Sequence, residues 1–103
     1  MVTQYKNLIN GEMVGTSEML DVVNPANEEV IGQVPASGEA ELNSAVTAAR
    51  AAFKTWSKKP IDERRAVVQA IAGVINENSD ELFRLLTAEQ GKPHAQAQGE
   101  IMG

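Results

Sequence analysis

The sequence predicts an α+β fold in which short β-strands in residues 1–37 precede three to four helices in residues 38–103. Apolar residues of the first part fall in short runs separated by turn signals. From Leu42 onward, apolar residues instead recur three and four residues apart, which is the period of an amphipathic helix. The 103 residues (11.1 kDa) correspond to one small domain or to a part of a larger one.

The first strands form a hairpin over residues 7–14. Asn10-Gly11 separates two short apolar runs, and this pair favours a type I′ turn because both central residues need positive φ. A strand over 19–25 follows and ends in an Asn-Pro turn. The next strand, over 29–35, alternates Val30, Gly32 and Val34 on one face, and Pro35 indicates an edge position or the end of the strand.

The first predicted helix follows residues 36–38. Glu39 and Glu41 suit its N-terminus, where the helix dipole favours negative charge. The lysines and proline of residues 57–60 end it. Its apolar stripe, expected to pack in a core, comprises Leu42, Ala45, Val46, Ala49, Ala52, Phe53 and Trp56.

Three further helical stretches follow. The second helix is expected to start near Pro60, whose fixed φ suits a first helical position, and Asn76–Asn78 ends or kinks it. Asn78 is expected to cap the third helix, with Glu81 as its capping-box partner, and Gly91 to terminate that helix. A fourth stretch runs from about residue 95 to 103 without a stop signal, so we expect the natural sequence to continue. The second and third helices carry apolar faces comprising Val67, Val68, Ile71, Ala72 and Ile75, and Leu82, Phe83, Leu85 and Leu86.

Composition excludes several classes of function. The chain has no cysteine, which excludes disulfides, thiolate metal sites and a cysteine nucleophile, and its one histidine is His94. The net charge is −5 without a basic stripe, so we expect no nucleic-acid partner. No apolar run approaches 18 residues and no secretory signal opens the chain, so we expect no membrane association and a cytoplasmic location.

No residue pattern predicts a catalytic, cofactor-binding or metal-binding site. The acidic pairs have no apolar pocket that would raise a carboxyl pKa, and the charged cluster Asp62–Arg65 is typical of a solvated first helical turn. Gly91-Lys92 lacks the upstream glycine and the hydroxyl residue of a phosphate-binding loop. His94 is expected at the surface. The acidic pairs are Glu28-Glu29 and Glu39/Glu41.

Several stretches in order nevertheless resemble the amino-terminal region of the aldehyde dehydrogenase superfamily. The resemblance extends from about Leu8 to Ile101, and its last part is most similar to the succinate-semialdehyde dehydrogenases. The stretches are Leu8–Glu12, Val22–Asn27, Val30–Val34, Ala45–Trp56, Asp62–Arg65, Asn78–Leu82 and Glu89–Pro93.

The resemblance implies a fold and a reaction for the whole protein. Residues 1–103 would be the amino-terminal portion of the cofactor-binding domain in a larger α/β fold, and the protein would oxidise an aldehyde to a carboxylic acid with NAD or NADP. In that family a cysteine thiolate attacks the carbonyl, hydride passes to the nicotinamide, and a glutamate activates the water that hydrolyses the thioester. These residues lie further along the family sequence, so the segment would be scaffold. The expected partners are the remainder of the polypeptide and further copies of the whole protein, as a dimer or tetramer.

Some positions and alternatives stay open. Val22 and Val23 match one side of a monovalent cation site of some family members, whereas Glu100 matches the other side only with a one-residue gap, so no metal site is predicted. A stand-alone helical binding or assembly module without catalysis is the alternative function, and a small carboxylate enzyme is a third. The sequence determines neither the aldehyde nor the choice between NAD and NADP.

Overall fold

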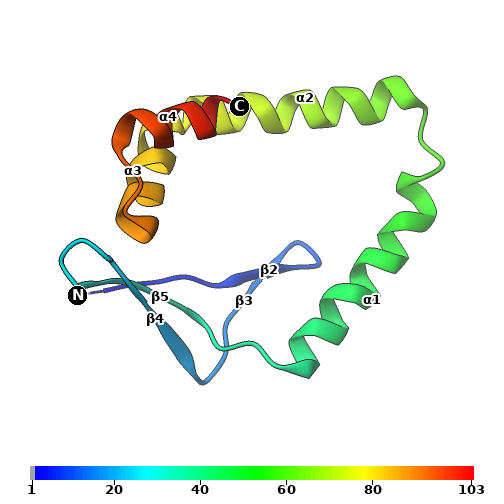
Figure 1. The fold of residues 1–103 in the computed structure, drawn as a ribbon. Coiled ribbons are helices and arrows are strands. Elements are labelled where there is room, and N and C mark those ends of the chain that lie inside the picture. The colour runs from blue at the N-terminus through cyan, green and yellow to red at the C-terminus, as the bar shows by residue number, and fades with distance from the viewer. Residues whose placement is uncertain (1) are drawn as a thin grey trace. The chain divides into compact units, whose positions relative to one another are not determined.

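The computed structural model describes residues 2–103, which form five short strands followed by four helices (Figure 1). The chain divides into two compact units. The first comprises the residues up to Val22 together with Gly32–Lys59, and the second comprises Val23–Ile31 together with Pro60–Gly103. The elements are β1 (Thr3–Gln4), β2 (Asn7–Ile9), β3 (Glu12–Val14), β4 (Met19–Val23), β5 (Val30–Pro35), α1 (Glu39–Trp56), α2 (Ile61–Glu77), α3 (Ser79–Gln90) and α4 (His94–Met102).

Strands β2 and β3 form the predicted hairpin. Ile9 pairs with Glu12, and the two residues between them both have positive φ, 53° at Asn10 and 76° at Gly11. Positive φ at both central positions is the type I′ geometry that the Asn-Gly pair favours. The prediction for this turn is therefore confirmed.

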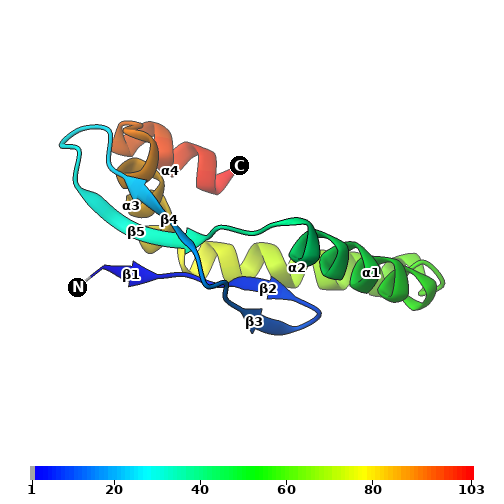
Figure 2. The same cartoon turned by 90° about the horizontal axis from the view of Figure 1, so that it is seen from below.

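The second sheet has the strand order β1-β5-β4, with β1 parallel to β5 (Figure 2). Strand β1 was not predicted, because two residues are too few to show an apolar period. Pro35 ends β5, but β5 is the central strand, so the edge position considered for Pro35 is wrong. A Cβ at Gly32 would lie 2.8 Å from Cε2 of Tyr5, and the tyrosine ring therefore needs a glycine beneath it.

The turn between β4 and β5 is built by asparagine side chains. The Oδ1 of Asn24 accepts a hydrogen bond from the Ala26 N–H (2.9 Å), and the Asn24 N–H donates to the carbonyl of Glu29 (2.8 Å). Glu28 has a φ of 62°. An asparagine side chain that bonds the backbone two residues on is typical of such turns, so the predicted Asn-Pro turn is confirmed.

The helices begin and end close to their predicted boundaries, with two corrections. Pro60 immediately precedes α2 with a ψ of 146°, so the helix begins at Ile61. Asn78 has φ −107° and ψ 18°, which is not the extended conformation of an N-cap residue. Its Nδ2 donates instead to the carbonyl of Val74 (2.8 Å), so the side chain caps the end of α2, and the capping box with Glu81 is wrong.

Helices α3 and α4 pack side by side in the second unit (Figure 1). Gly91 ends α3 with a φ of 76°, and its N–H donates to the carbonyl of Thr87 (2.8 Å), as expected for a C-terminal glycine. Helix α4 begins at His94, one residue earlier than predicted. Phe83 (4% exposed) and Ala97 (0%) are the buried apolar residues of the described chain and form the centre of this packing.

The apolar stripes of α1 and α2 do not enter a core within residues 2–103. Phe53 is 66% exposed, so the prediction that it packs in a core is wrong for this chain, whereas Trp56 is half-buried. Large apolar residues exposed on these two helices are Leu42, Val46, Phe53, Ile61, Val67, Val68, Ile71, Val74 and Ile75.

Candidate functional site

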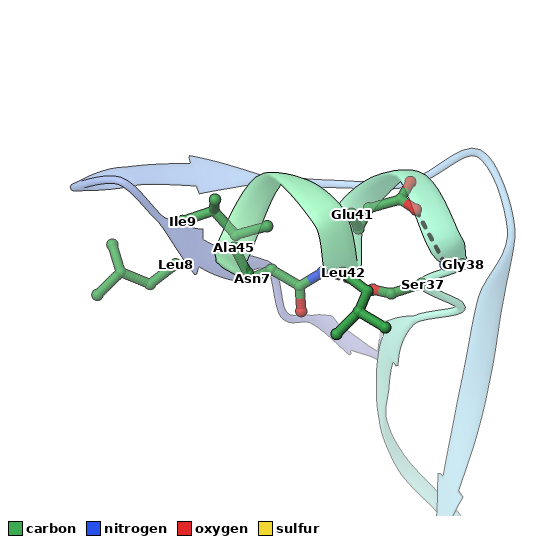
Figure 3. A pocket seen from close by; sticks show the side chains of 8 residues that line it. All are labelled: Asn7, Leu8, Ile9, Ser37, Gly38, Glu41, Leu42 and Ala45. Carbon is green, nitrogen blue, oxygen red and sulfur yellow. Dashed lines mark hydrogen bonds between the residues drawn. The ribbon is translucent and has the colours of Figure 1, made fainter. Parts of the chain in front are cut away.

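A hollow of ≈ 530 Å³ lies between β2 and the N-terminal turns of α1, all within the first unit (Figure 3). Asn7 and Ser37 meet across one end, where the Asn7 Nδ2 donates to the Ser37 Oγ (2.6 Å). Leu8 and Leu42 are 70% and 62% exposed, so much of the lining is apolar surface in contact with solvent. Its lining residues are Asn7, Leu8, Ile9, Ser37, Gly38, Glu41, Leu42 and Ala45.

The one carboxylate in this hollow already has a structural role. The Glu41 Oε2 accepts a hydrogen bond from the Gly38 N–H (2.9 Å), drawn as a dashed line in Figure 3. This hydrogen bond is the main reason why the pKa of the Glu41 carboxyl lies below its ordinary value of 4.5, and a hydrogen bond from the backbone N–H of Glu41 itself lowers it further. A carboxylate with a lowered pKa is a weak base near neutral pH. The hollow holds no histidine or second carboxylate to pair with it.

Two more hollows lie beside α1 and β2. These two further hollows share Ile9, Asn10 and Ala48 with each other, and one of them also shares Ala45 with the first. Small alanine side chains on this face of α1 leave open space beside β2. The predicted apolar stripe included Ala45, Ala49 and Ala52 but not Ala48, and the period alone does not reveal which stripe positions stay uncovered. One of the two further hollows is lined mainly by apolar residues, whereas the other also has the polar side chains of Asn43, Ser44 and Thr47 in its lining.

The charged residues singled out in the sequence have ordinary local partners. Arg65 bonds the carboxylate of Asp62 (3.0 Å) in the first turn of α2. Lys92 forms an ion pair with Glu100, the residue that matches the monovalent cation site of some family members only with a one-residue gap. The ring of exposed His94 packs edge-on against Phe83, with centroids 5.5 Å apart. The expectation that His94 lies at the surface is confirmed.

The two acidic pairs lie in separate settings. Glu28 and Glu29 belong to the turn after β4, where the Glu29 carboxylate accepts from Asn27 Nδ2 (3.3 Å). Glu39 and Glu41 occupy the first turn of α1. Within residues 2–103, no three histidine, cysteine or acidic residues gather in a way that could hold a metal ion. No helix in this range is long and apolar enough to cross a membrane.

A nicotinamide dinucleotide does not fit the residues of this hollow. Its diphosphate is commonly bound by free backbone N–H groups at a helix N-terminus. At the start of α1, the Glu41 carboxylate already accepts from the Gly38 N–H, and its negative charge would repel a phosphate. The sequence also lacks Gly-x-Gly-x-x-Gly. We therefore assign no cofactor contact to this hollow.

Comparison with known proteins identifies the family of this chain. The profile of the aldehyde dehydrogenase family matches residues 13–103. The chain belongs to the aldehyde dehydrogenase family. It corresponds to the amino-terminal segment of that family, which confirms the resemblance seen in the sequence.

Its relatives include enzymes that act on semialdehydes. The chain is 42% identical over 102 residues to malonate-semialdehyde dehydrogenase 1 of Shouchella clausii, covering 97% of this chain and 21% of that protein. It is also 42% identical over 96 residues to the NADP⁺-dependent succinate-semialdehyde dehydrogenase of Escherichia coli, covering 91% and 20%. The two identities are equal, so they do not single out the succinate-semialdehyde branch.

The fold matches solved members of the family. The NAD-dependent aldehyde dehydrogenase from Sinorhizobium meliloti superposes with a TM-score of 0.93 at 33% identity, over 99% of this chain and 21% of that one. The chain thus spans about a fifth of the length of the relatives it matches. The absence of catalytic residues from this fifth stays a prediction from the sequence.

Proposed function

We propose that residues 1–103 are the amino-terminal scaffold of an NAD(P)-dependent aldehyde dehydrogenase that oxidises an aldehyde to a carboxylic acid. The match of the family profile to residues 13–103 carries this proposal. The chain has no cysteine, so the family's nucleophile must come from polypeptide outside these residues. The segment contributes to the cofactor-binding domain without touching the reacting atoms.

The substrate class that we propose is a semialdehyde, an aldehyde with a carboxylate at its other end. Two relatives at 42% identity are named for malonate semialdehyde and succinate semialdehyde. One relative is named for NADP and one solved structure for NAD, so both cofactors enter the test. The whole enzyme is proposed to be a cytoplasmic dimer or tetramer, in keeping with the family.

The test uses the native protein. An antibody to this segment captures the protein from its source cells, and the captured material is assayed for NAD⁺ or NADP⁺ reduction with malonate semialdehyde, succinate semialdehyde and an uncharged aldehyde of similar length. The purified 103-residue chain is the matched control and should be inactive. Captured protein without aldehyde-dependent reduction would contradict the proposed reaction, and faster turnover of the uncharged aldehyde would contradict the semialdehyde class.

A stand-alone binding module is the second candidate. The apolar hollow between β2 and α1, lined partly by Leu8 and Leu42, favours it because exposed apolar surface is typical of interaction sites. This candidate predicts that a monomeric 103-residue chain with its own partner occurs in the cell. The proposed dehydrogenase predicts that the segment occurs only within a longer polypeptide.

A further inference from the structure

The turn between β2 and β3 holds the one Asn-Gly pair of the sequence (Figure 2). Asn10 and Gly11 are its two central residues, and both are exposed to solvent. The chain has seven asparagines. The other six precede leucine, proline, glutamate or serine, so Asn10 alone has a neighbour without a side chain.

This pair is suited to a reaction between its own atoms. The backbone nitrogen of Gly11 can attack the side-chain amide carbon Cγ of Asn10. A C–N bond forms, the Gly11 nitrogen gives up its proton, and the amide group leaves as ammonia, so a five-membered succinimide results. Water then opens the ring. Attack of water at Cγ gives aspartate, and attack at the main-chain carbonyl gives isoaspartate, in which the backbone runs through the former side chain. The net change replaces the amide NH₂ with a hydroxyl from water and involves no oxidation.

The structure leaves this attack unobstructed. Glycine has no Cβ that would hinder its nitrogen, and no heavy atom beyond its chain neighbours lies within 4 Å of the Cβ position at Gly11. Within residues 2–103, no hydrogen bond holds the side chain of Asn10. The side chains of Asn24 and Asn78, by contrast, are held by hydrogen bonds of 2.9 and 2.8 Å. Asn10 is therefore free to present its amide carbon.

The hairpin that carries the turn is short. Ring closure requires the backbone of Asn10 to rotate until the Gly11 nitrogen faces Cγ. Strands β2 and β3 have three residues each and form a sheet of two strands. Such a hairpin is marginally stable in water, so its tip opens locally and often. The type I′ turn therefore does not lock Asn10 in an unreactive conformation.

We propose that Asn10-Gly11 is a site of spontaneous deamidation, at which Asn10 is converted through a succinimide to isoaspartate and aspartate. The proposal does not rest on the proposed function. Aspartate tolerates the positive φ of this position and keeps the turn. Isoaspartate adds a methylene to the backbone of a two-residue turn, whose length sets the pairing of Ile9 with Glu12.

Both products also add a negative charge beside α1. One further carboxylate takes the net charge of the chain from −5 to −6. Asn10 lines a hollow together with Ile9 and Ala48, so the new carboxylate meets a largely apolar lining. A charge placed against apolar surface costs free energy. We therefore expect the aged hairpin to pack less well on α1 than the fresh one.

The test follows each asparagine in the native polypeptide at its full length, captured with an antibody to residues 1–103. The protein is incubated at neutral pH, folded or unfolded in urea, and its peptides are sequenced by mass spectrometry that distinguishes aspartate from isoaspartate. Two asparagines of the same molecule are controls. Asn43 is also exposed but precedes serine within α1, and Asn24 precedes a proline, whose nitrogen has no hydrogen to lose. The variant Gly11→Ala adds a Cβ at the attacking residue.

The expected result is early conversion at position 10, with isoaspartate as the larger product. Asn43 and Asn24 should remain intact over the same interval, and Gly11→Ala should slow the conversion of Asn10 several-fold. Aspartate without isoaspartate would overturn the proposal, because direct hydrolysis of the amide gives aspartate alone. It would also be overturned by an unchanged rate in Gly11→Ala, or by a folded protein that keeps Asn10 intact while the urea-unfolded protein loses half of it. None of these readouts depends on turnover, so an inactive enzyme leaves this test unaffected.

Discussion

Gly91, at the end of α3, is a position where one added methyl group should lower stability for two separate reasons. Its φ of 76° lies in the left-handed region, where a side chain costs about 1–2 kcal/mol. A Cβ there would also lie 3.0 Å from Cγ of Pro25, closer than ordinary van der Waals contact. We therefore expect Gly91→Ala to lower the free energy of unfolding by about 2 kcal/mol, combining both effects.

Two other glycines provide matched controls for the same chemical change. Gly73 lies in the interior of α2 with nothing within 4 Å of its Cβ position, so Gly73→Ala should raise stability by about 0.5–1 kcal/mol. Gly11 also has a φ of 76° but has open space around its Cβ position. Gly11→Ala therefore measures the backbone cost alone, and the excess cost at Gly91 reports the contact with Pro25.

Urea denaturation of the 103-residue chain, followed by far-ultraviolet circular dichroism, measures these three changes. The expected order of stability is Gly73→Ala, wild type, Gly11→Ala and then Gly91→Ala. A Gly91→Ala chain as stable as wild type would refute the left-handed geometry at the end of α3. Equal losses at Gly11 and Gly91 would refute the contribution of the Pro25 contact.

Three further predictions concern stability. Because the pKa of Glu41 is lowered in the folded chain, its stabilising contribution is present above the ordinary pKa of 4.5 and is lost as the pH falls through the folded-state value. Glu41→Gln should therefore reduce the loss of stability at acid pH when the urea midpoint is measured against pH. Superimposable profiles for the variant and the wild type would contradict this. Asn78 donates to the last turn of α2, so Asn78→Asp and Asn78→Ala should each lower the free energy of unfolding by about 1 kcal/mol in the same urea denaturation, whereas an N-cap role would tolerate aspartate. Phe83→Ala should cost about 3 kcal/mol or more, and Leu85→Ala (36% exposed) much less; equal losses in calorimetry would count against the α3–α4 core.

The sequence predicted the elements whose signals are local. The hairpin followed from Asn10-Gly11, and the end of α3 from Gly91, because a positive φ restricts the residue type strongly. The boundaries of α1 followed from its apolar period and its acidic first turn. The family assignment came from several short motifs in order, each of which is weak alone.

Other features depend on partners that a sequence period does not reveal. Strand β1 exists because Thr3 and Gln4 pair with β5, far along the chain. Asn78 carries both a donor and an acceptor, and the backbone conformation decides which helix it caps. The stripes of α1 and α2 were recognised, but their period is the same whether this chain or another polypeptide covers them. The exposure of Phe53 is the clearest example.

The central proposal is that this chain works as one fifth of an aldehyde dehydrogenase. The most direct measurement is the size of the native polypeptide in its source cells, by immunoblot with an antibody to residues 1–103. A single band several times heavier than 11.1 kDa is the expected result. A single band at 11.1 kDa would contradict the proposal and favour the stand-alone binding module.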